Sequence, residues 1–209
     1  MAILQANNIA FSYVSGNPVL QRINFKAESG ERVALQAESG RGKSTLCQIL
    51  AGYLKPDEGE VTLDGEPVQA SPGKPTPVQL IWQHPEHSVD PHLRVASSLE
   101  EAGSIPDDLM RNMGIKSEWL ARFPHELSGG ELQRICIARA LATSPRFIVA
   151  DEISTMLDAI TQATLWNFLL DHCSKNEIGL VLVTHSRALQ DRLATRVVTL
   201  DDASAPIKA

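Results

Sequence analysis

A glycine-rich loop between an expected strand and an expected helix is the feature that most constrains this chain. The apolar segment 32–36 leads directly into residues 37–45, which read AESGRGKST. Backbone N–H groups in such a loop, together with the positive end of the helix that follows, form a cradle for phosphate oxygens. We therefore predict a strand, a phosphate-binding loop and a helix in that order.

Each residue type in this loop suits a nucleoside triphosphate. We expect the binding residues to be Ser39, Gly40, Arg41, Gly42, Lys43, Ser44 and Thr45. The glycines admit the phosphates close to the backbone, the lysine reaches the β- and γ-phosphates, and the serine hydroxyl ligates Mg²⁺. Ala37 occupies the position of the motif's first glycine, and it is unfavourable only if φ is positive there. We expect extended backbone at Ala37; an inert glycine-rich turn is the alternative reading of the loop.

The remaining apolar segments predict an α/β fold. Strands are predicted at residues 32–36, 78–82, 147–150 and 180–183, and helices at 44–53, 128–142, 158–173 and 186–193. Because these strand segments are apolar on both alternating faces, they suit a mostly parallel sheet covered by helices.

Two regions depart from this alternation. Residues 1–26 and 59–68 read as short strands of a small antiparallel sheet, and residues 91–124 read as short helical pieces in an insertion. We predict one domain, 1–209, with a helical subdomain at about 84–142.

Polar side chains follow two of the apolar strands. Asp151 and Glu152 end one strand, and His185 ends another. Ligands of open α/β sheets bind beyond the carboxyl ends of the strands. We expect Asp151 to hold Mg²⁺ through water, Glu152 to polarise the attacking water, and His185 to donate to a γ-phosphate oxygen. The alternatives are a solvated strand end and a structural histidine.

A second glycine-rich segment also begins a predicted helix. Ser128 and Glu131 have the spacing of a capping box, with Gly129 and Gly130 between them. A capped helix with two glycines in its first turn offers an anion site, although a plain helix start is the alternative. Because the chain already has one phosphate loop, we expect this segment to bind the γ-phosphate of a partner's ATP. Two copies closing around ATP would form a motor.

Composition narrows the possible partners. The formal net charge of −6 does not favour nucleic acid, and no apolar run is long enough to span a membrane. We do not expect secretion, because the first residues show no basic stretch followed by an apolar core, and three isolated cysteines suit a reducing compartment. We expect Cys47 to be a small buried side chain, with a redox switch as the alternative. His84, His87 and His92 allow a metal site, although the surrounding prolines favour an irregular loop.

Together these motifs resemble the ATP-binding subunit of an ATP-binding cassette (ABC) transporter, over nearly the whole chain. The resemblance implies a P-loop NTPase core, ATP and Mg²⁺ as cofactors, and ATP hydrolysis. It identifies Gly40–Thr45 as the Walker A loop, residues 127–131 as the signature motif, residues 148–152 as Walker B and His185 as the switch histidine. It also implies that Gln83 contacts Mg²⁺ and water, that Tyr13 stacks on adenine, and that Asp158 belongs to the D-loop.

The resemblance further implies partners and a location. Residues 83–91 and 123–126 are similar to the oligopeptide, dipeptide and nickel importer group. The expected partners are integral membrane permeases, a second ATPase subunit and, indirectly, an extracytoplasmic solute-binding protein, with the chain peripheral at the cytoplasmic face. Ile153 and Met156 depart from the usual Pro and Ala and Ala37 from the motif's first glycine, so the two ATP sites of a heterodimer are candidates for unequal activity. A soluble non-transport ABC ATPase is the alternative, whereas a small-molecule P-loop kinase leaves the signature motif unexplained.

Overall fold

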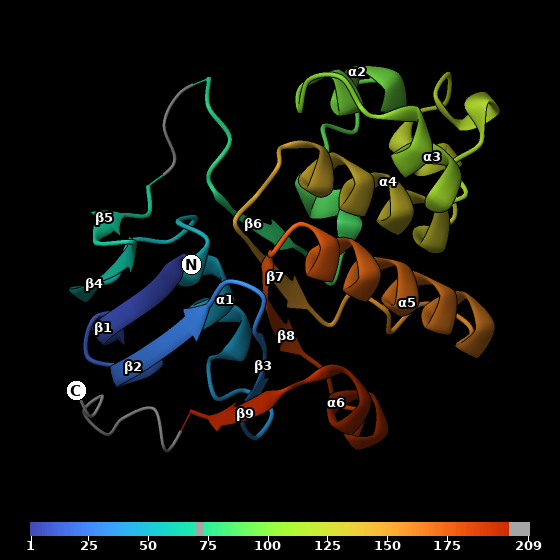
Figure 1. The fold of residues 1–209 in the computed structure, drawn as a ribbon. Helices are drawn as coiled ribbons and strands as arrows, with labels where there is room; N and C mark the ends of the chain where they lie inside the picture. The colour runs from blue at the N-terminus through green and yellow to red at the C-terminus, as the bar shows by residue number, and fades with distance from the viewer. Residues whose placement is uncertain (70–72, 201–209) are drawn as a thin grey trace.

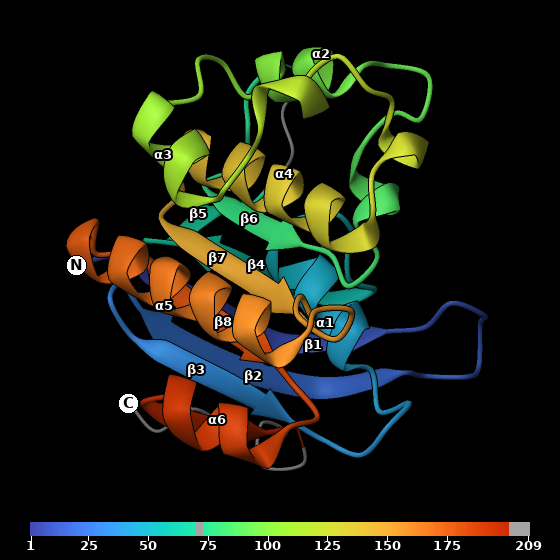
Figure 2. The ribbon, with the colours of Figure 1, turned by 90° about the vertical axis from the view of Figure 1, so that its right-hand side faces the viewer.

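The computed structural model describes residues 1–69 and 73–200, so the last part of the predicted domain, 201–209, lies outside the described residues. One antiparallel and one parallel sheet face each other, and further helices cover the parallel sheet (Figures 1 and 2). Within the described ranges, no helix is both long and apolar enough to cross a membrane.

The parallel sheet has the strand order β6-β7-β8-β3-β9, and every neighbouring pair in it is parallel. Its strands are β3 (Arg32–Gln36), β6 (Val78–Ile81), β7 (Phe147–Asp151), β8 (Gly179–Val183) and β9 (Arg196–Thr199). This arrangement confirms the predicted α/β class. The edge strand β9 was not predicted from the sequence.

Both faces of the central strands β7 and β8 are buried, which explains why these two strands are almost entirely apolar. In β7, Phe147 and Val149 pack in the cluster that contains the antiparallel sheet, whereas Ile148 and Ala150 pack in the cluster that contains the outer helices. Successive side chains of a strand point to opposite faces, so each central strand contributes to two cores.

The antiparallel sheet is made by β1 (Ile3–Phe11), β2 (Leu20–Glu28), β4 (Glu58–Leu63) and β5 (Glu66–Pro67), in the order β2-β1-β4-β5. Its first two strands are longer than the predicted short strands. Their pairing continues past a register shift between Ala6 and Ile9, where Asn8 has a φ of 52°. Helix α1 (Lys43–Leu50) packs between the two sheets (Figure 1).

Most of the outer helices pack on the other face of the parallel sheet, whereas the first of them packs on a longer neighbouring helix (Figure 2). The outer helices are α2 (Val95–Glu100), α3 (Asp107–Asn112), α4 (Gly129–Ala142), α5 (Ala159–Lys175) and α6 (Arg187–Leu193), with short 3-10 turns at Pro85–Ser88, Ser117–Trp119 and Pro124–Glu126. Val95, Leu99, Trp119 and Ile135 form a small core of their own beside α4. The predicted helical insertion therefore packs around one long helix.

We expect Gly179→Ala to destabilise the sheet, because a Cβ atom at Gly179 would collide with the ring of Phe147. Overpacking of this kind lowers the free energy of unfolding by about 1–3 kcal/mol, which urea denaturation measures. The double variant Gly179→Ala/Phe147→Leu should be more stable than the sum of the single effects indicates. Unchanged stability of Gly179→Ala would contradict this packing.

Candidate nucleotide-binding and catalytic site

The lysine of the glycine-rich loop is held by the loop itself. Lys43 is the first residue of α1, and its Nζ donates to the carbonyl oxygens of Ala37 at 2.8 Å and Glu38 at 2.9 Å. These two bonds partly satisfy the ammonium group of a lysine that is only 8% exposed. The loop therefore curves around a single positive charge, next to the start of a helix.

Two glycines give the loop its curvature. Gly40 has a φ of 79° and Gly42 a φ of 84°, both in the region that favours glycine. Gly42 has little space as well, because an added Cβ would lie 2.7 Å from Cδ2 of Leu20. Ala37 is not among the described residues with positive φ, so its side chain causes no such strain.

Tyr13 lies beside the loop. Its hydroxyl is 3.2 Å from Oγ1 of Thr45, and its ring packs edge-to-face on Phe11 with centroids 5.0 Å apart. The side chain is 61% exposed, so an aromatic surface is accessible next to the phosphate loop. This is the position that stacking on a base requires, although the stacking itself stays a prediction.

Two predicted site residues, His185 and Gln83, both contact the carboxylate of a third, Glu152. Glu152 follows β7; its Oε1 is 2.7 Å from Nε2 of His185, which follows β8. Its Oε2 accepts a hydrogen bond of 3.3 Å from the amide of Gln83, which follows β6. Because β6, β7 and β8 are adjacent and parallel, their carboxyl ends bring these side chains together. The Glu152 side chain is only 12% exposed.

Asp151 is the buried member of the carboxylate pair. Its Oδ1 has no hydrogen-bond partner among the described residues. Burial raises the pKa of this carboxyl, a hydrogen bond with Ser44 opposes the rise, and the charge of Glu152 adds to it. An unpaired carboxylate oxygen near a serine hydroxyl fits a hard divalent cation, because Mg²⁺ takes oxygen ligands. Ser44 and Asp151 therefore suit Mg²⁺, while the expected contact of Gln83 with the ion stays a prediction.

The second glycine-rich segment begins α4 with the predicted capping box. Oγ of Ser128 accepts from the N–H of Glu131 at 3.3 Å, and the Glu131 carboxylate accepts from the N–H of Ser128 at 2.8 Å. The bond from the Ser128 backbone is the main reason that the pKa of Glu131 is lowered. The capping-box prediction is confirmed.

Another segment crosses the two glycines after Ser128, and it leaves little room for a side chain at Gly130. An added Cβ at Gly130 would lie 2.8 Å from Cδ2 of Leu157, and one at Gly129 would lie 3.5 Å from Sδ of Met156. The stretch that follows Glu152 therefore packs against the start of α4. One short segment thus links the Glu152 carboxylate to the second glycine-rich segment.

Asp158 has a local structural role in this state. It caps α5: its Oδ1 accepts from the N–H groups of Ile160 and Thr161, both at 3.0 Å, and its Oδ2 accepts from the Thr161 hydroxyl at 2.6 Å. These hydrogen bonds lower the pKa of the Asp158 carboxyl. Its expected contact with a nucleotide stays a prediction.

Two alternative sites raised by the sequence receive little support. His84 Nδ1 lies 3.3 Å from Glu86 Oε1, but the described part of the chain contains no group of three or more His, Cys, Asp or Glu side chains arranged to hold a metal. Cys47 is fully buried, and burial raises the pKa of its thiol well above the ordinary value. A buried, protonated thiol is a poor redox switch.

One cluster was not predicted from the sequence: the side chains of Gln162 and Trp166 both donate to the hydroxyl oxygen of Ser154, two residues after Glu152. Local spacing gives no signal for the contact between Ser154 and α5. The only available signal is a tryptophan within an apolar helix face, because a buried indole N–H needs an acceptor.

Comparison with known families decides the identity of this arrangement. The family model for ABC transporters matches residues 20–155, which include the phosphate loop, the second glycine-rich segment and the carboxylate pair. The chain belongs to the ABC transporter family. As in the sequence prediction, an ATP-binding cassette accounts for both glycine-rich segments of this ABC chain.

Two relatives of this ABC chain carry names that refer to import. It is 33% identical to the glutathione import ATP-binding protein GsiA of Pectobacterium atrosepticum, over 87% of this chain and 32% of that protein. It is 35% identical to the nickel import ATP-binding protein NikE of Rhodospirillum rubrum, over 88% of this chain and 73% of that protein. The chain thus spans about a third of the length of GsiA.

A solved structure has the same fold as this ABC chain. The post-hydrolysis dimer of the ATP-binding cassette MJ0796, bound to ADP and phosphate, superposes with a TM-score of 0.81 at 25% identity and covers 96% of this chain and 95% of that one. A likeness to cbiO1 from Clostridium perfringens, with a TM-score of 0.75 at 22% identity, agrees on the fold. The predicted P-loop NTPase core is confirmed.

We expect Asp151→Asn to stabilise the nucleotide-free chain at pH 7. The folded-state pKa of Asp151 is raised above its ordinary value of 3.8, so ionisation costs stability as pH rises through and above that value. The amide removes this cost, and the gain should vanish below the ordinary pKa. Thermal melts from pH 3 to 8 measure it; an Asp151→Asn chain that melts lower at pH 7 would contradict the raised pKa.

Proposed function

We propose that this chain is the ATP-binding and ATP-hydrolysing subunit of an ABC importer. It would energise uptake of a small solute, such as a peptide, nickel or a metal chelate, through separate membrane permeases. The observation that carries the proposal is the Glu152 carboxylate held between His185 and Gln83 at the same sheet edge as the phosphate loop. Relatives named as import ATP-binding proteins favour uptake over export.

The loop residues bind the nucleotide in this proposal. Backbone N–H groups of residues 39–45 contact the phosphates, and Lys43 exchanges the carbonyls of Ala37 and Glu38 for phosphate oxygens. Tyr13 stacks on adenine beside Thr45. Ser44, Asp151 and Gln83 would hold Mg²⁺, partly through water, and the ion would supply neutralisation of the phosphate charge.

Glu152 is the proposed catalytic base. It accepts a hydrogen bond from the attacking water, which the Gln83 amide helps to orient. His185 donates to the γ-phosphate, so nucleotide binding draws its imidazole from the Glu152 carboxylate, where it lies at 2.7 Å. Phosphoryl transfer depends chiefly on positioning and charge stabilisation, so the positions of Glu152, Gln83 and His185 determine the rate of hydrolysis.

The second half of each site is proposed to come from a partner ATPase subunit. Ser128, Gly129 and Gly130 would contact the γ-phosphate of the partner's ATP, with Asp158 nearby. Met156 and Ile160 are large apolar side chains that are 54% and 80% exposed next to these residues, which favours burial against another subunit. If that partner is a different chain, Ala37, Ile153 and Met156 would make the two ATP sites unequal. If it is a second copy, the two sites would be the same.

We expect Glu152→Gln to bind ATP normally and to hydrolyse it about 100- to 10,000-fold more slowly, because the amide cannot accept the proton. The variant should accumulate as an ATP-bound dimer on size-exclusion chromatography. Wild-type hydrolysis by Glu152→Gln would remove this residue from the role of base.

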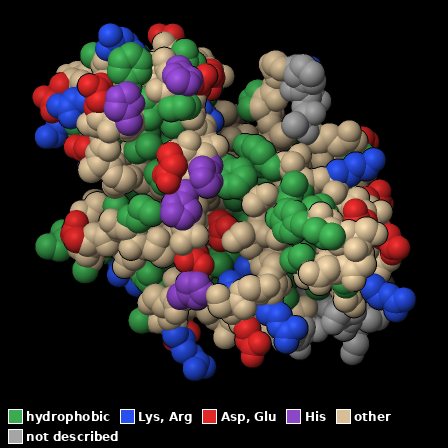
Figure 3. Space-filling view, turned by 180° about the vertical axis from the view of Figure 1, so that it is seen from behind, with side chains coloured by type: hydrophobic (Ala, Val, Ile, Leu, Met, Phe, Trp, Pro, Cys, Tyr) green, Lys and Arg blue, Asp and Glu red, His purple; other side chains and the backbone are tan. Residues whose placement is uncertain are grey.

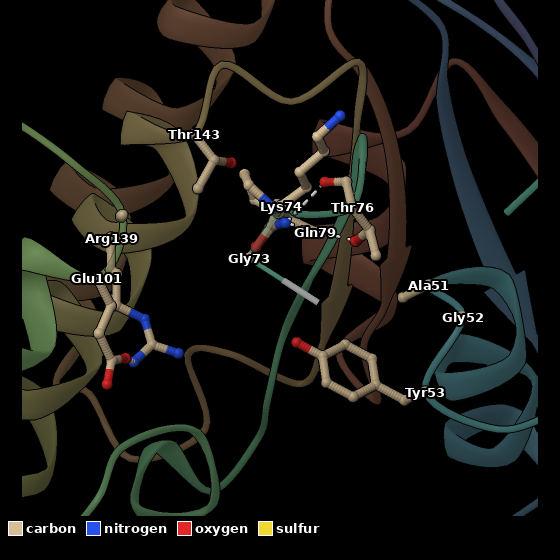
Figure 4. Close-up of a pocket in the computed structure, with 12 residues that line it drawn as sticks. Ala51, Gly52, Tyr53, Gly73, Lys74, Thr76, Gln79, Glu101, Arg139 and Thr143 are labelled. Carbon is tan, nitrogen blue, oxygen red and sulfur yellow. Dashed lines mark hydrogen bonds and ion pairs between the residues drawn. The ribbon is translucent and has the colours of Figure 1, made fainter. Parts of the chain in front are cut away.

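A groove between the helical layer and the core is proposed to receive the permease. The groove has a volume of about 480 Å³. Arg139 and Glu101 line its helical side, and Tyr53, from the segment that follows α1, lines the opposite side (Figure 4). Tyr53 also packs edge-to-face on Trp82, next to Gln83. On the face opposite to that of Figure 1, histidine side chains border hydrophobic ones, as Figure 3 shows. A segment docked in the groove would contact Tyr53 and, through its ring, act on Trp82 beside Gln83.

We expect Tyr53→Ser to weaken co-purification with the permease while leaving ATP affinity unchanged, because Tyr53 is 53% exposed and lines the groove away from the phosphate loop. Val197→Ser, at a 44% exposed site on β9, is the matched control. Equal recovery of the permease with both variants would contradict docking in this groove.

The remaining partners and the location follow from the importer proposal. The chain would act as one domain with a helical subdomain at about 84–142, peripheral at the cytoplasmic face of the membrane. An extracytoplasmic solute-binding protein would contact it only through the permease, and no nucleic acid is involved. Recovery of soluble partners alone, without permeases, would favour a non-transport ABC ATPase instead.

A further inference from the structure

The backbone of Glu152 has a conformation that its surroundings must maintain. Its φ of 51° lies in the left-handed region, which is unfavourable for a residue with a side chain. Such conformations persist only where neighbouring groups fix them. The Glu152 N–H donates to the carbonyl of Val183 at 3.1 Å, and the Glu152 carbonyl accepts from the N–H of Thr155 at 3.3 Å and the hydroxyl of Thr155 at 3.2 Å.

Ser154 connects this turn to a long helix. Only 5% of Ser154 is exposed, and its Oγ accepts from Nε1 of Trp166 and from Nε2 of Gln162, both at 3.0 Å. The same Gln162 amide also donates to the carbonyl oxygen of Ser154 at 3.1 Å. A serine oxygen has two acceptor positions, so both are filled by α5.

The helix that supplies these donors is fixed in the core. Gln162 and Trp166 are four residues apart and therefore lie on one face of α5. Trp166 is 1% exposed and belongs to the hydrophobic cluster that contains Ile148 of β7 and Ile153 of the turn. The donors therefore cannot move independently of the strand that ends at Asp151.

We propose that Ser154, Gln162 and Trp166 form a positioning clamp that holds the Glu152 carboxylate in line for hydrolysis. This inference rests on the proposed role of Glu152 as the base. The clamp residues act through the backbone turn at 152–154, and none of them is a catalytic residue. Glu152 reaches His185 and Gln83 with different carboxylate oxygens, so rotation of the turn would break both contacts.

The clamp can be tested by removing its hydrogen bonds with little change in volume. Ser154→Ala removes the acceptor, Ser154→Thr keeps it, and Gln162→Leu removes one donor. Thr164→Val is the control, because it removes a hydroxyl of α5 that bonds only within the helix, to the carbonyl of Ile160 at 2.9 Å. ATP hydrolysis and thermal melting are measured for each variant in the transporter complex purified from membranes.

The clamp predicts a lower kcat with ATP binding preserved. Ser154→Ala and Gln162→Leu should reduce kcat about 10- to 100-fold, as misplacement of a catalytic group does, with KM for ATP changed less than about twofold. Ser154→Thr should recover most of the rate, and Thr164→Val should match the wild type. If Ser154→Ala fails to fold, the kcat of Gln162→Leu tests the clamp instead. Gln162 is only partly buried, so its replacement should leave the fold intact.

Three results would overturn the clamp: unchanged kcat in both loss variants, parallel changes in kcat and KM, or a rate loss that follows melting temperature and that Ser154→Thr does not rescue. Glu152→Gln is measured alongside. If that variant keeps wild-type hydrolysis, the proposed function of Glu152 fails. If it loses hydrolysis while Ser154→Ala and Gln162→Leu do not, only the clamp fails.

Discussion

The parallel pairing of β3, β8, β7 and β6 is the constraint on which the rest of the structure depends. It brings the carboxyl ends of strands that are far apart in the sequence to one edge of the sheet. The phosphate loop follows β3, and Gln83, Glu152 and His185 follow the other three strands. If one of these strands were displaced, the Glu152 carboxylate would lose its contact with His185 or with Gln83, because these contacts are only 2.7 and 3.3 Å long.

This edge of the sheet carries a positive group, the Lys43 ammonium, and a negative group, the Asp151 carboxylate, which together would complement a ligand with both negative and positive charges. The Lys43 ammonium donates to two backbone carbonyls, and one oxygen of the buried Asp151 carboxylate has no hydrogen-bond partner within residues 1–69 and 73–200. Burial is the main reason that the pKa of Asp151 is raised. A triphosphate with its divalent cation would satisfy both groups, so the binding of substrate relieves electrostatic costs that the fold carries in its absence.

The elements that could be predicted are those that depend on residues close together in the sequence. The strand at 32–36 has the predicted bounds, and the capping box at Ser128 forms as expected, because apolar runs and caps depend on neighbouring residues. Strand β9 was missed because it is short and partly exposed, so it lacks an apolar run. The contact of Ser154 with α5 was missed because only tertiary packing brings the two together. No spacing rule indicated the left-handed backbone of Glu152.

The central claim is that one chain contributes halves of two different ATP sites. A structure of the Glu152→Gln transporter complex with ATP and Mg²⁺ tests it most directly, by showing which signature segment contacts each γ-phosphate. The account predicts that the triphosphate held by Lys43 meets the signature serine of a neighbouring ATPase subunit. A triphosphate enclosed by Lys43 and Ser128 of the same chain would contradict it.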